Sequence, residues 1–138
     1  MPKKVLLIED DEFIRDLYKR QLDMCDMFTY AFSNGTDGLK SVEENQYDLI
    51  LLDIMLPGMN GLDVLRNLKA TDATKNIPVI MVSNLGQDAV VKEGFALGAI
   101  GYLIKATFTP DQIVHQFLFS SLSLRLRMLV KNFCDLLH

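Results

Sequence analysis

Several residue types that build special sites are scarce in this sequence. It has no tryptophan, and only two cysteines and two histidines among its 138 residues. Cys25 and Cys134 have neither metal-ligand spacing nor a redox pair motif, so we expect reduced thiols rather than a disulfide. His115 and His138 are isolated and are interpreted as surface histidines. The small number of cysteines and histidines argues against a disulfide-rich fold and against a metal centre built from cysteine or histidine.

Long hydrophobic runs and an excess of basic residues are also absent. Only four apolar residues, 5–8, follow the basic start of the chain, whereas a secretory signal needs about 7–15. No stretch approaches the roughly 18 apolar residues of a membrane span. The formal net charge of −4 argues against direct nucleic-acid binding by the chain as a whole. We therefore expect a cytoplasmic protein without a membrane span.

What is present is an ordinary globular composition, 49% hydrophobic and 23% charged, in a length that suits one compact domain. Short apolar runs alternate with amphipathic segments of helical period. The runs are residues 5–8, 27–32, 49–52, 79–82 and 100–104. Most of them are nearly unbroken, which is typical of strands buried on both faces. The pattern predicts an α/β fold, a parallel sheet with helices on both faces.

Polar residues follow four of the predicted strands. Four consecutive acids, residues 9–12, come after the first strand, and Asp53, Ser83 and Lys105 end the third, fourth and fifth. Ligands of such folds bind outside the carboxyl ends of the strands. We therefore expect these four groups to meet at one edge of the sheet.

The acidic run has two interpretations. Crowded carboxylates repel each other, and a divalent cation such as Mg²⁺, which prefers oxygen ligands, relieves that repulsion. Alternatively, acids at the start of a helix accept hydrogen bonds from its free amides and interact with its dipole. We favour the helix-capping interpretation for Asp11 and Glu12, and both interpretations stay open for Glu9 and Asp10 on their own.

The position of Asp53 favours the Mg²⁺ interpretation for Glu9 and Asp10. Asp53 ends an aliphatic strand and is expected to face Glu9 and Asp10 across the strand ends. A carboxylate can act as a nucleophile that accepts a phosphoryl group, and that reaction needs cations to neutralise the transferred charge. Lys105, at the end of the fifth strand, can supply one of them.

At this point the sequence resembles a known family, the receiver domain of two-component response regulators. The matching motifs are residues 5–11 (VLLIEDD), 51–61 (LLDIMLPGMNG), 78–83 (PVIMVS) and 98–105 (GAIGYLIK). Each motif alone is weak, but four in order with strand–helix spacing are specific. The resemblance covers roughly residues 4–120. It implies a doubly wound, flavodoxin-like five-stranded parallel sheet of order 2-1-3-4-5, with a receiver domain at residues 1–120.

The resemblance implies a metal site and a phosphoacceptor. Glu9 and Asp10 would bind Mg²⁺ together with Asp53 and the backbone carbonyl of Met55. Asp53 would take the phosphoryl group from a histidine kinase or a phosphotransfer protein. The chain would thus be a signalling module rather than an enzyme with turnover, catalysing at most its own phosphorylation and dephosphorylation.

The resemblance also implies a switch. Ser83 would hydrogen-bond one phosphoryl oxygen and Lys105 would pair with another. Tyr102 would turn inward as Ser83 moves toward the phosphate, which would reshape the surface near the fourth and fifth helices for a downstream protein partner. The added charge and acceptor oxygens of a phosphoryl group are the physical cause.

Two positions depart from the family pattern. Ala106 follows Lys105, where the family usually has a proline joined by a cis bond. A cis bond before another residue costs about 2.5–4 kcal/mol, so either strain is stored or the bond is trans, and a trans bond would displace the Lys105 ammonium. Asn84 replaces the small residue that usually follows Ser83, which would alter the access of water to the phosphoryl group.

Residues 121–138 form an apolar C-terminal extension. Residues 121–128 alternate as in a strand, yet apolar residues of the extension also recur at helical steps of three and four. We favour a helix. Either the extension folds back onto the core, or its apolar stripe contacts another protomer or a partner, and a membrane-surface helix is a third option. We favour self-association, as a homodimer through residues 113–138.

Three alternatives to a switching receiver stay open. A receiver-like scaffold that does not switch would share the fold. A flavodoxin-like electron carrier would need a phosphate-binding loop after the first strand, where the acids 9–12 would repel the ligand. An aspartyl-phosphate phosphatase commonly has a second aspartate two residues after the nucleophile, and Met55 occupies that position.

Overall fold

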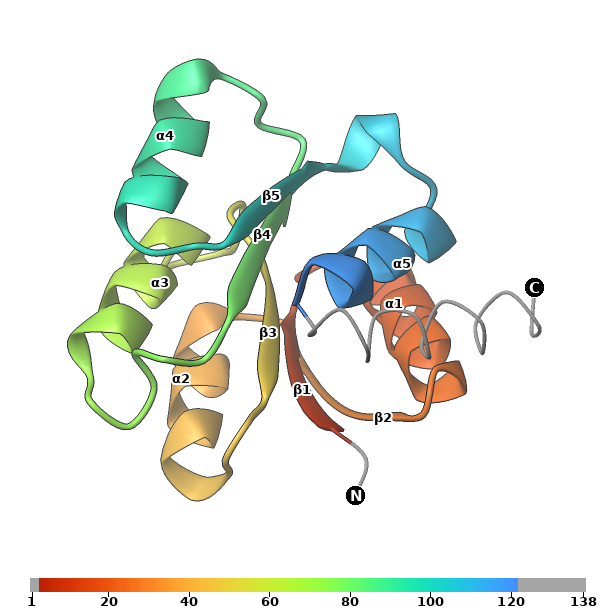
Figure 1. The fold of residues 1–138 in the computed structure, drawn as a ribbon, viewed down its shortest axis with the longest axis horizontal. Coiled ribbons are helices and arrows are strands. Elements are labelled where there is room, and N and C mark those ends of the chain that lie inside the picture. The colour runs from red at the N-terminus through yellow and green to blue at the C-terminus, as the bar shows by residue number, and fades with distance from the viewer. Residues whose placement is uncertain (1–2, 122–138) are drawn as a thin grey trace.

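The computed structural model describes residues 3–121, in which strands and helices alternate along the chain (Figure 1). The strands are β1 (Lys3–Ile8), β2 (Met27–Phe32), β3 (Leu49–Asp53), β4 (Val79–Ser83) and β5 (Gly101–Ile104). The helices are α1 (Glu12–Met24), α2 (Gly35–Glu44), α3 (Gly61–Ala70), α4 (Asp88–Ala96) and α5 (Pro110–Ser121), with a 3₁₀ turn, η1, at Lys105–Thr107.

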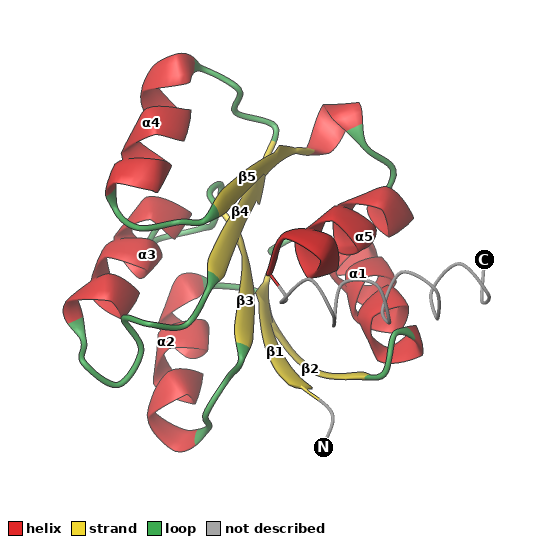
Figure 2. Cartoon of the chain, viewed as in Figure 1, coloured by secondary structure: helices red, strands yellow, loops and turns green. Residues whose placement is uncertain are grey.

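The five strands form one parallel sheet of order β2-β1-β3-β4-β5. Helices α2, α3 and α4 cover one face of the sheet, and α1 and α5 cover the other (Figures 1 and 2). Strand order reverses between β1 and β3, so ligands are expected at the carboxyl ends of these two strands. The predicted doubly wound α/β fold is confirmed.

Burial on both faces explains the unbroken apolar runs. In β1, Val5 and Leu7 pack in the core under α1 and α5, whereas Leu6 and Ile8 pack in the core under α2, α3 and α4. Every residue of β3 and β4 is buried. Because successive side chains of a strand point to opposite faces, a strand between two helix layers needs an apolar residue at nearly every position.

Three helices begin with a side-chain cap. Asp11, Asn34 and Asn60 each accept a hydrogen bond from the backbone amide three residues later. For Asp11, an oxygen lies 3.0 Å from the amide nitrogen of Ile14. The expected capping role of Asp11 is therefore present, and it leaves Glu9 and Asp10 in the turn between β1 and α1.

The cysteine prediction was wrong at Cys25, which is disulfide-bonded. Spacing along a sequence does not report which sulfur atoms approach each other in space. His115, predicted at the surface, is half-buried on α5. Cys134, His138 and the extension beyond Ser121 lie outside the described residues, so the predicted helix and self-association there stay predictions. Among the described helices, none is long and apolar enough to cross a membrane.

Candidate functional site

The carboxyl ends of β1, β3 and β5 surround a pocket of about 670 Å³. Its lining residues are Glu9, Asp10, Asp11, Ile14, Asp53, Met55, Leu56, Pro57, Asn84 and Lys105. Three chain segments that are distant in sequence thus bring five of the predicted site residues to one edge of the sheet: Glu9, Asp10, Asp53, Met55 and Lys105. Ser83 and Tyr102 are not in the lining.

Lys105 joins the ends of three strands through two ion pairs. Its Nζ lies 2.6 Å from Oε1 of Glu9 and 2.7 Å from Oδ2 of Asp53. Both carboxylates are buried, with side chains 0% and 2% exposed, and Lys105 itself is 19% exposed. Burial alone would lower the pKa of Lys105, but the two carboxylates raise that pKa above its ordinary value.

The donor set at this edge fits a divalent cation. Ligand oxygens of Glu9, Asp10 and Asp53 all lie within 4.8 Å of one another. Burial, together with the nearby Asp53 carboxylate, raises the pKa of Glu9 to about 8, although Lys105 acts in the opposite direction. Oε2 of Glu9 is buried and has no hydrogen-bond partner among the described residues. A buried acceptor without a donor, beside two further carboxylates, is the environment that a hard cation stabilises.

The backbone around Asp53 fixes its carboxylate. The amide of Met55 donates a hydrogen bond to Oδ1 of Asp53 at 3.1 Å, so the two carboxylate oxygens have separate donors, Met55 and Lys105. The start of α3 lies against the same residue, because a Cβ on Gly61 would lie only 2.1 Å from the carbonyl oxygen of Asp53. Glycine is the residue that allows this close approach.

Arg15 contacts the site but was not among the site residues predicted from the sequence. Nη1 of Arg15 donates to the carbonyl oxygens of Glu9 at 3.0 Å and of Asp10 at 3.3 Å. The signal was present, because an arginine one helical turn after the Asp11 cap points its side chain back toward the preceding turn.

Ser83 and Tyr102 meet beside the pocket through Leu85. Oγ of the fully buried Ser83 accepts a hydrogen bond from the amide of Leu85 at 3.1 Å. The hydroxyl of Tyr102 donates to the carbonyl oxygen of Leu85 at 2.5 Å. Tyr102 is half-buried, and burial raises its pKa. The serine and the tyrosine therefore contact the same residue, which links the end of β4 to β5.

Ala106, which stands where the family usually has proline, does not displace the Lys105 ammonium from the site. No peptide bond within residues 3–121 is cis, so the Lys105–Ala106 bond is trans. Lys105 begins η1, yet its Nζ still reaches both carboxylates. The flexible four-carbon stem of a lysine tolerates a different backbone path. Asn84, the second departure, is exposed and lines the pocket.

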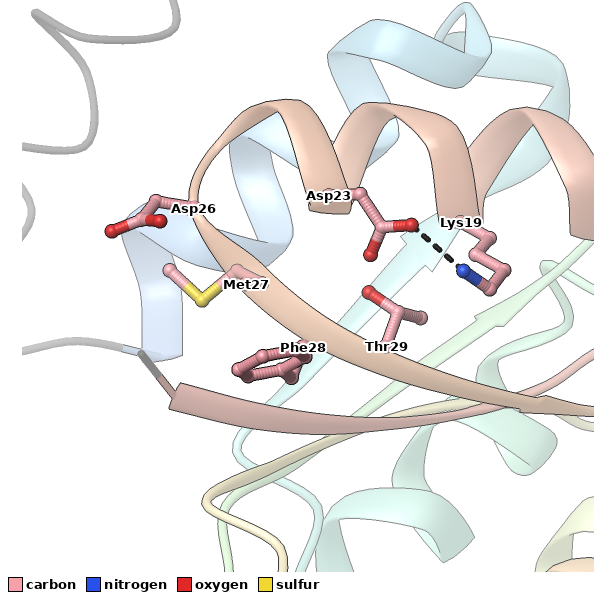
Figure 3. A pocket seen from close by; sticks show the side chains of 6 residues that line it. All are labelled: Lys19, Asp23, Asp26, Met27, Phe28 and Thr29. Carbon is pink, nitrogen blue, oxygen red and sulfur yellow. Dashed lines mark hydrogen bonds and ion pairs between the residues drawn. The ribbon is translucent and has the colours of Figure 1, made fainter. Parts of the chain in front are cut away.

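A second pocket, of about 400 Å³, lies beside α1 and the amino end of β2, away from the carboxyl edge (Figure 3). It is lined by Lys19, Asp23, Asp26, Met27, Phe28 and Thr29. Lys19 and Asp23 form an ion pair of 2.7 Å that neutralises both charges. Its lining therefore lacks the three grouped carboxylates, and the ammonium paired with two buried carboxylates, that mark the first pocket as the candidate site.

Comparison with known proteins agrees with this geometry. The model of the response regulator receiver domain family matches residues 5–117. The transcriptional regulatory protein SrrA of Staphylococcus aureus is 35% identical over 114 residues, which cover 83% of this chain and 46% of SrrA. This chain thus spans about half the length of the curated relatives it matches.

Solved structures share the fold. The chemotaxis response regulator CheY4 of Vibrio cholerae superposes with a TM-score of 0.78 at 24% identity, over 84% of this chain and 96% of CheY4. The Mn²⁺-bound form of response regulator Rcp1 superposes with a TM-score of 0.75 at 26% identity, over 82% of this chain and 89% of Rcp1. The family match, the sheet order and the acidic edge agree, and this chain belongs to the response regulator receiver domain family of two-component signalling.

Proposed function

We propose that this receiver domain accepts a phosphoryl group on Asp53 and so acts in a two-component phosphorelay in the cytoplasm. The observation that carries the proposal is the Lys105 ammonium held between the buried carboxylates of Glu9 and Asp53 at the pocket. A lysine in this place offsets the charge of two carboxylates and is ready to pair with an incoming anion.

The transfer step is a displacement at phosphorus. An Asp53 carboxylate oxygen bonds to the phosphorus of a phosphohistidine, on a histidine kinase or a phosphotransfer protein. The phosphorus–nitrogen bond breaks, the freed imidazole nitrogen takes a proton from solvent, and Asp53 becomes an acyl phosphate. Lys105 then pairs with a phosphoryl oxygen.

Glu9, Asp10 and Asp53, with the backbone carbonyl of Met55, would hold Mg²⁺. When bound, Mg²⁺ supplies positive charge that neutralises the phosphoryl oxygens. The unpartnered Oε2 of Glu9 supports this assignment, and so does the Mn²⁺-bound form of the similar Rcp1. The chain's own residues bring the carboxylates together and keep Lys105 beside them.

We further propose that phosphorylation is read by a downstream protein at the surface near α4 and α5. The Ser83 hydroxyl turns from Leu85 toward the phosphoryl group, and the Tyr102 ring shifts in response. Both side chains contact Leu85, so movement of one changes the surroundings of the other. We propose protein contacts as the output of the described residues, without direct nucleic-acid binding.

Phosphotransfer from a phosphorylated histidine phosphotransfer protein tests the proposal. A labelled phosphoryl group should move to the wild-type chain and not to Asp53→Ala. In an NMR spectrum of the phosphorylated protein, the amide signals of α4 and β5 should shift. Label on Asp53→Ala equal to wild type would refute the assignment of the phosphoacceptor. Label on Asp53 without shifts in α4 and β5 would favour a scaffold that does not switch.

A further inference from the structure

Arg15 lies on the first turns of α1, one helical turn beyond the Asp11 cap. The backbone amide of Arg15 donates a hydrogen bond to the carbonyl oxygen of Asp11 at 2.8 Å, as is regular in an α-helix. Long side chains on a helix point toward its amino end, so the guanidinium lies over the turn between β1 and α1. From there Nη1 donates to the carbonyl oxygens of Glu9 and Asp10.

These two carbonyls stand where the β1 ladder ends. The amide of Glu9 still donates to the carbonyl oxygen of Phe32 at 3.0 Å, which continues the pairing of β1 with β2. Within residues 3–121, Arg15 is the only hydrogen-bond donor to the carbonyls of Glu9 and Asp10. Glu9 is thus fixed on both sides of its Cα, by Phe32 at its amide and by Arg15 at its carbonyl.

Fixing these carbonyls fixes the directions of the carboxylates. Since the peptide unit is planar, a carbonyl that is held toward α1 limits where the side chains on either side of it can point. The carboxylates of Glu9 and Asp10 point instead to the pocket, where they come within 4.8 Å of Asp53. The guanidinium stays charged at all relevant pH values and also offsets repulsion in the acidic run.

We infer that Arg15 is a positioning residue that sets the divalent-cation affinity of the site through the backbone of Glu9 and Asp10. This inference rests on the proposed function, because it concerns the same site. Residues that orient metal ligands typically change metal affinity by about 10–100-fold when they are removed.

The test is an NMR titration of the full chain with MgCl₂, which follows the amides of Asp10 and Met55. Arg15→Ala should raise the Mg²⁺ concentration at the midpoint of the titration about tenfold. Arg15→Lys, which keeps the charge but not the planar donor group, should have a midpoint between those of the wild type and Arg15→Ala. Arg20→Ala is the matched control, since Arg20 is an exposed arginine on α1 whose side chain makes no hydrogen bond or ion pair with the described residues. It should leave the midpoint within about twofold of wild type.

A rate measurement separates positioning from general damage. With acetyl phosphate as donor, Arg15→Ala should need more Mg²⁺ for half-maximal phosphorylation, yet approach the wild-type rate at saturating Mg²⁺. A wild-type midpoint in Arg15→Ala, or an equal shift in Arg20→Ala, would overturn the inference. If Arg15→Ala does not fold, a wild-type midpoint in Arg15→Lys would overturn it. A wild-type chain without any Mg²⁺-dependent shift would instead contradict the proposed function itself.

Discussion

Lys105 lies between two buried carboxylates, and at the residue scale the charge balance of the site depends on it. Replacing it by methionine removes the cation but keeps most of the packing volume. Burial already raises the pKa of Glu9 to about 8 against the lowering effect of Lys105, so without the ammonium Glu9 holds its proton more firmly. We expect Lys105→Met to fold and to take up phosphoryl groups from acetyl phosphate at least about tenfold more slowly than wild type.

Intact-mass spectrometry over time measures that rate. Lys75→Met is a suitable control, since Lys75 is half-exposed and, within residues 3–121, its ammonium pairs only with the exposed Asp72. A Lys105→Met rate within about twofold of wild type would remove Lys105 from the transfer step.

Glu9 should make the free energy of unfolding depend on pH. Its pKa is raised by burial from 4.5 to about 8, so between these values the folded protein holds a proton that the unfolded chain releases. This stabilisation is complete below about pH 4.5 and is lost as the pH rises through about 8, by at most about 1.4 kcal/mol per pH unit.

Glu9→Gln removes this titration. In urea unfolding with EDTA present, the variant should lose less free energy of unfolding between about pH 5 and pH 8 than wild type does. Equal losses in the two proteins would show that Glu9 is ionised at neutral pH in the folded state.

At the scale of secondary-structure elements, the contact between β3 and α3 positions Asp53. A methyl group on Gly61 would lie 2.1 Å from the Asp53 carbonyl oxygen and 2.6 Å from Cα of Ile54, and backbone atoms cannot yield as a flexible side chain can. Gly61→Ala should therefore lower the free energy of unfolding by about 1–3 kcal/mol and slow phosphorylation of Asp53.

Gly86→Ala serves as the comparison for that substitution. The nearest atom to its added methyl group would be the tip of the Ile104 side chain at 3.5 Å, an ordinary contact. Urea unfolding of both variants measures the difference. Equal free energies of unfolding for Gly61→Ala and Gly86→Ala would contradict a close contact between β3 and α3.

The elements differ in how far sequence could predict them. Unbroken apolar runs identified β3 and β4, because burial on both faces constrains every position. The position of the Lys105 ammonium could not be derived, because it depends on how a long side chain compensates for η1 and a trans bond. Arg15 was missed for a similar reason, since its role depends on side-chain direction and not on spacing.

At the scale of the whole molecule, self-association was predicted through residues 113–138. The apolar residues of α5 in that range, Ile113, Val114, Phe117 and Leu118, are buried in the core and cannot contact a second copy, so the proposal is now confined to the apolar extension, residues 121–138. Deleting residues 121–138 should convert a dimer to a monomer in sedimentation equilibrium run with a reductant. The shortened chain should still unfold cooperatively in urea, because the two cores of the described residues are built from residues 5–118. Equal monomers before and after deletion would end this proposal.

Across the whole chain, the sequence predicted the fold and the site but not the covalent link at Cys25. Strand–helix alternation predicted the parallel sheet, and the polar residues after its strands predicted the acidic edge. The strand order came from the resemblance to the receiver family. The disulfide at Cys25 did not follow, since the spacing of two cysteines in a sequence does not report whether their sulfur atoms come within bonding distance. SrrA is about twice as long as the matched region, so its activity as a transcriptional regulator describes SrrA and not this chain.

The central claim is that Asp53 takes up a phosphoryl group at a cation-dependent site. The most direct measurement is the intact mass of the full chain after incubation with acetyl phosphate, with MgCl₂ or with EDTA, followed by peptide mapping. We predict a gain of about 80 Da at Asp53 with MgCl₂, and no gain with EDTA or in Asp53→Ala. An unmodified wild-type chain, under conditions that label another receiver domain, would contradict the account.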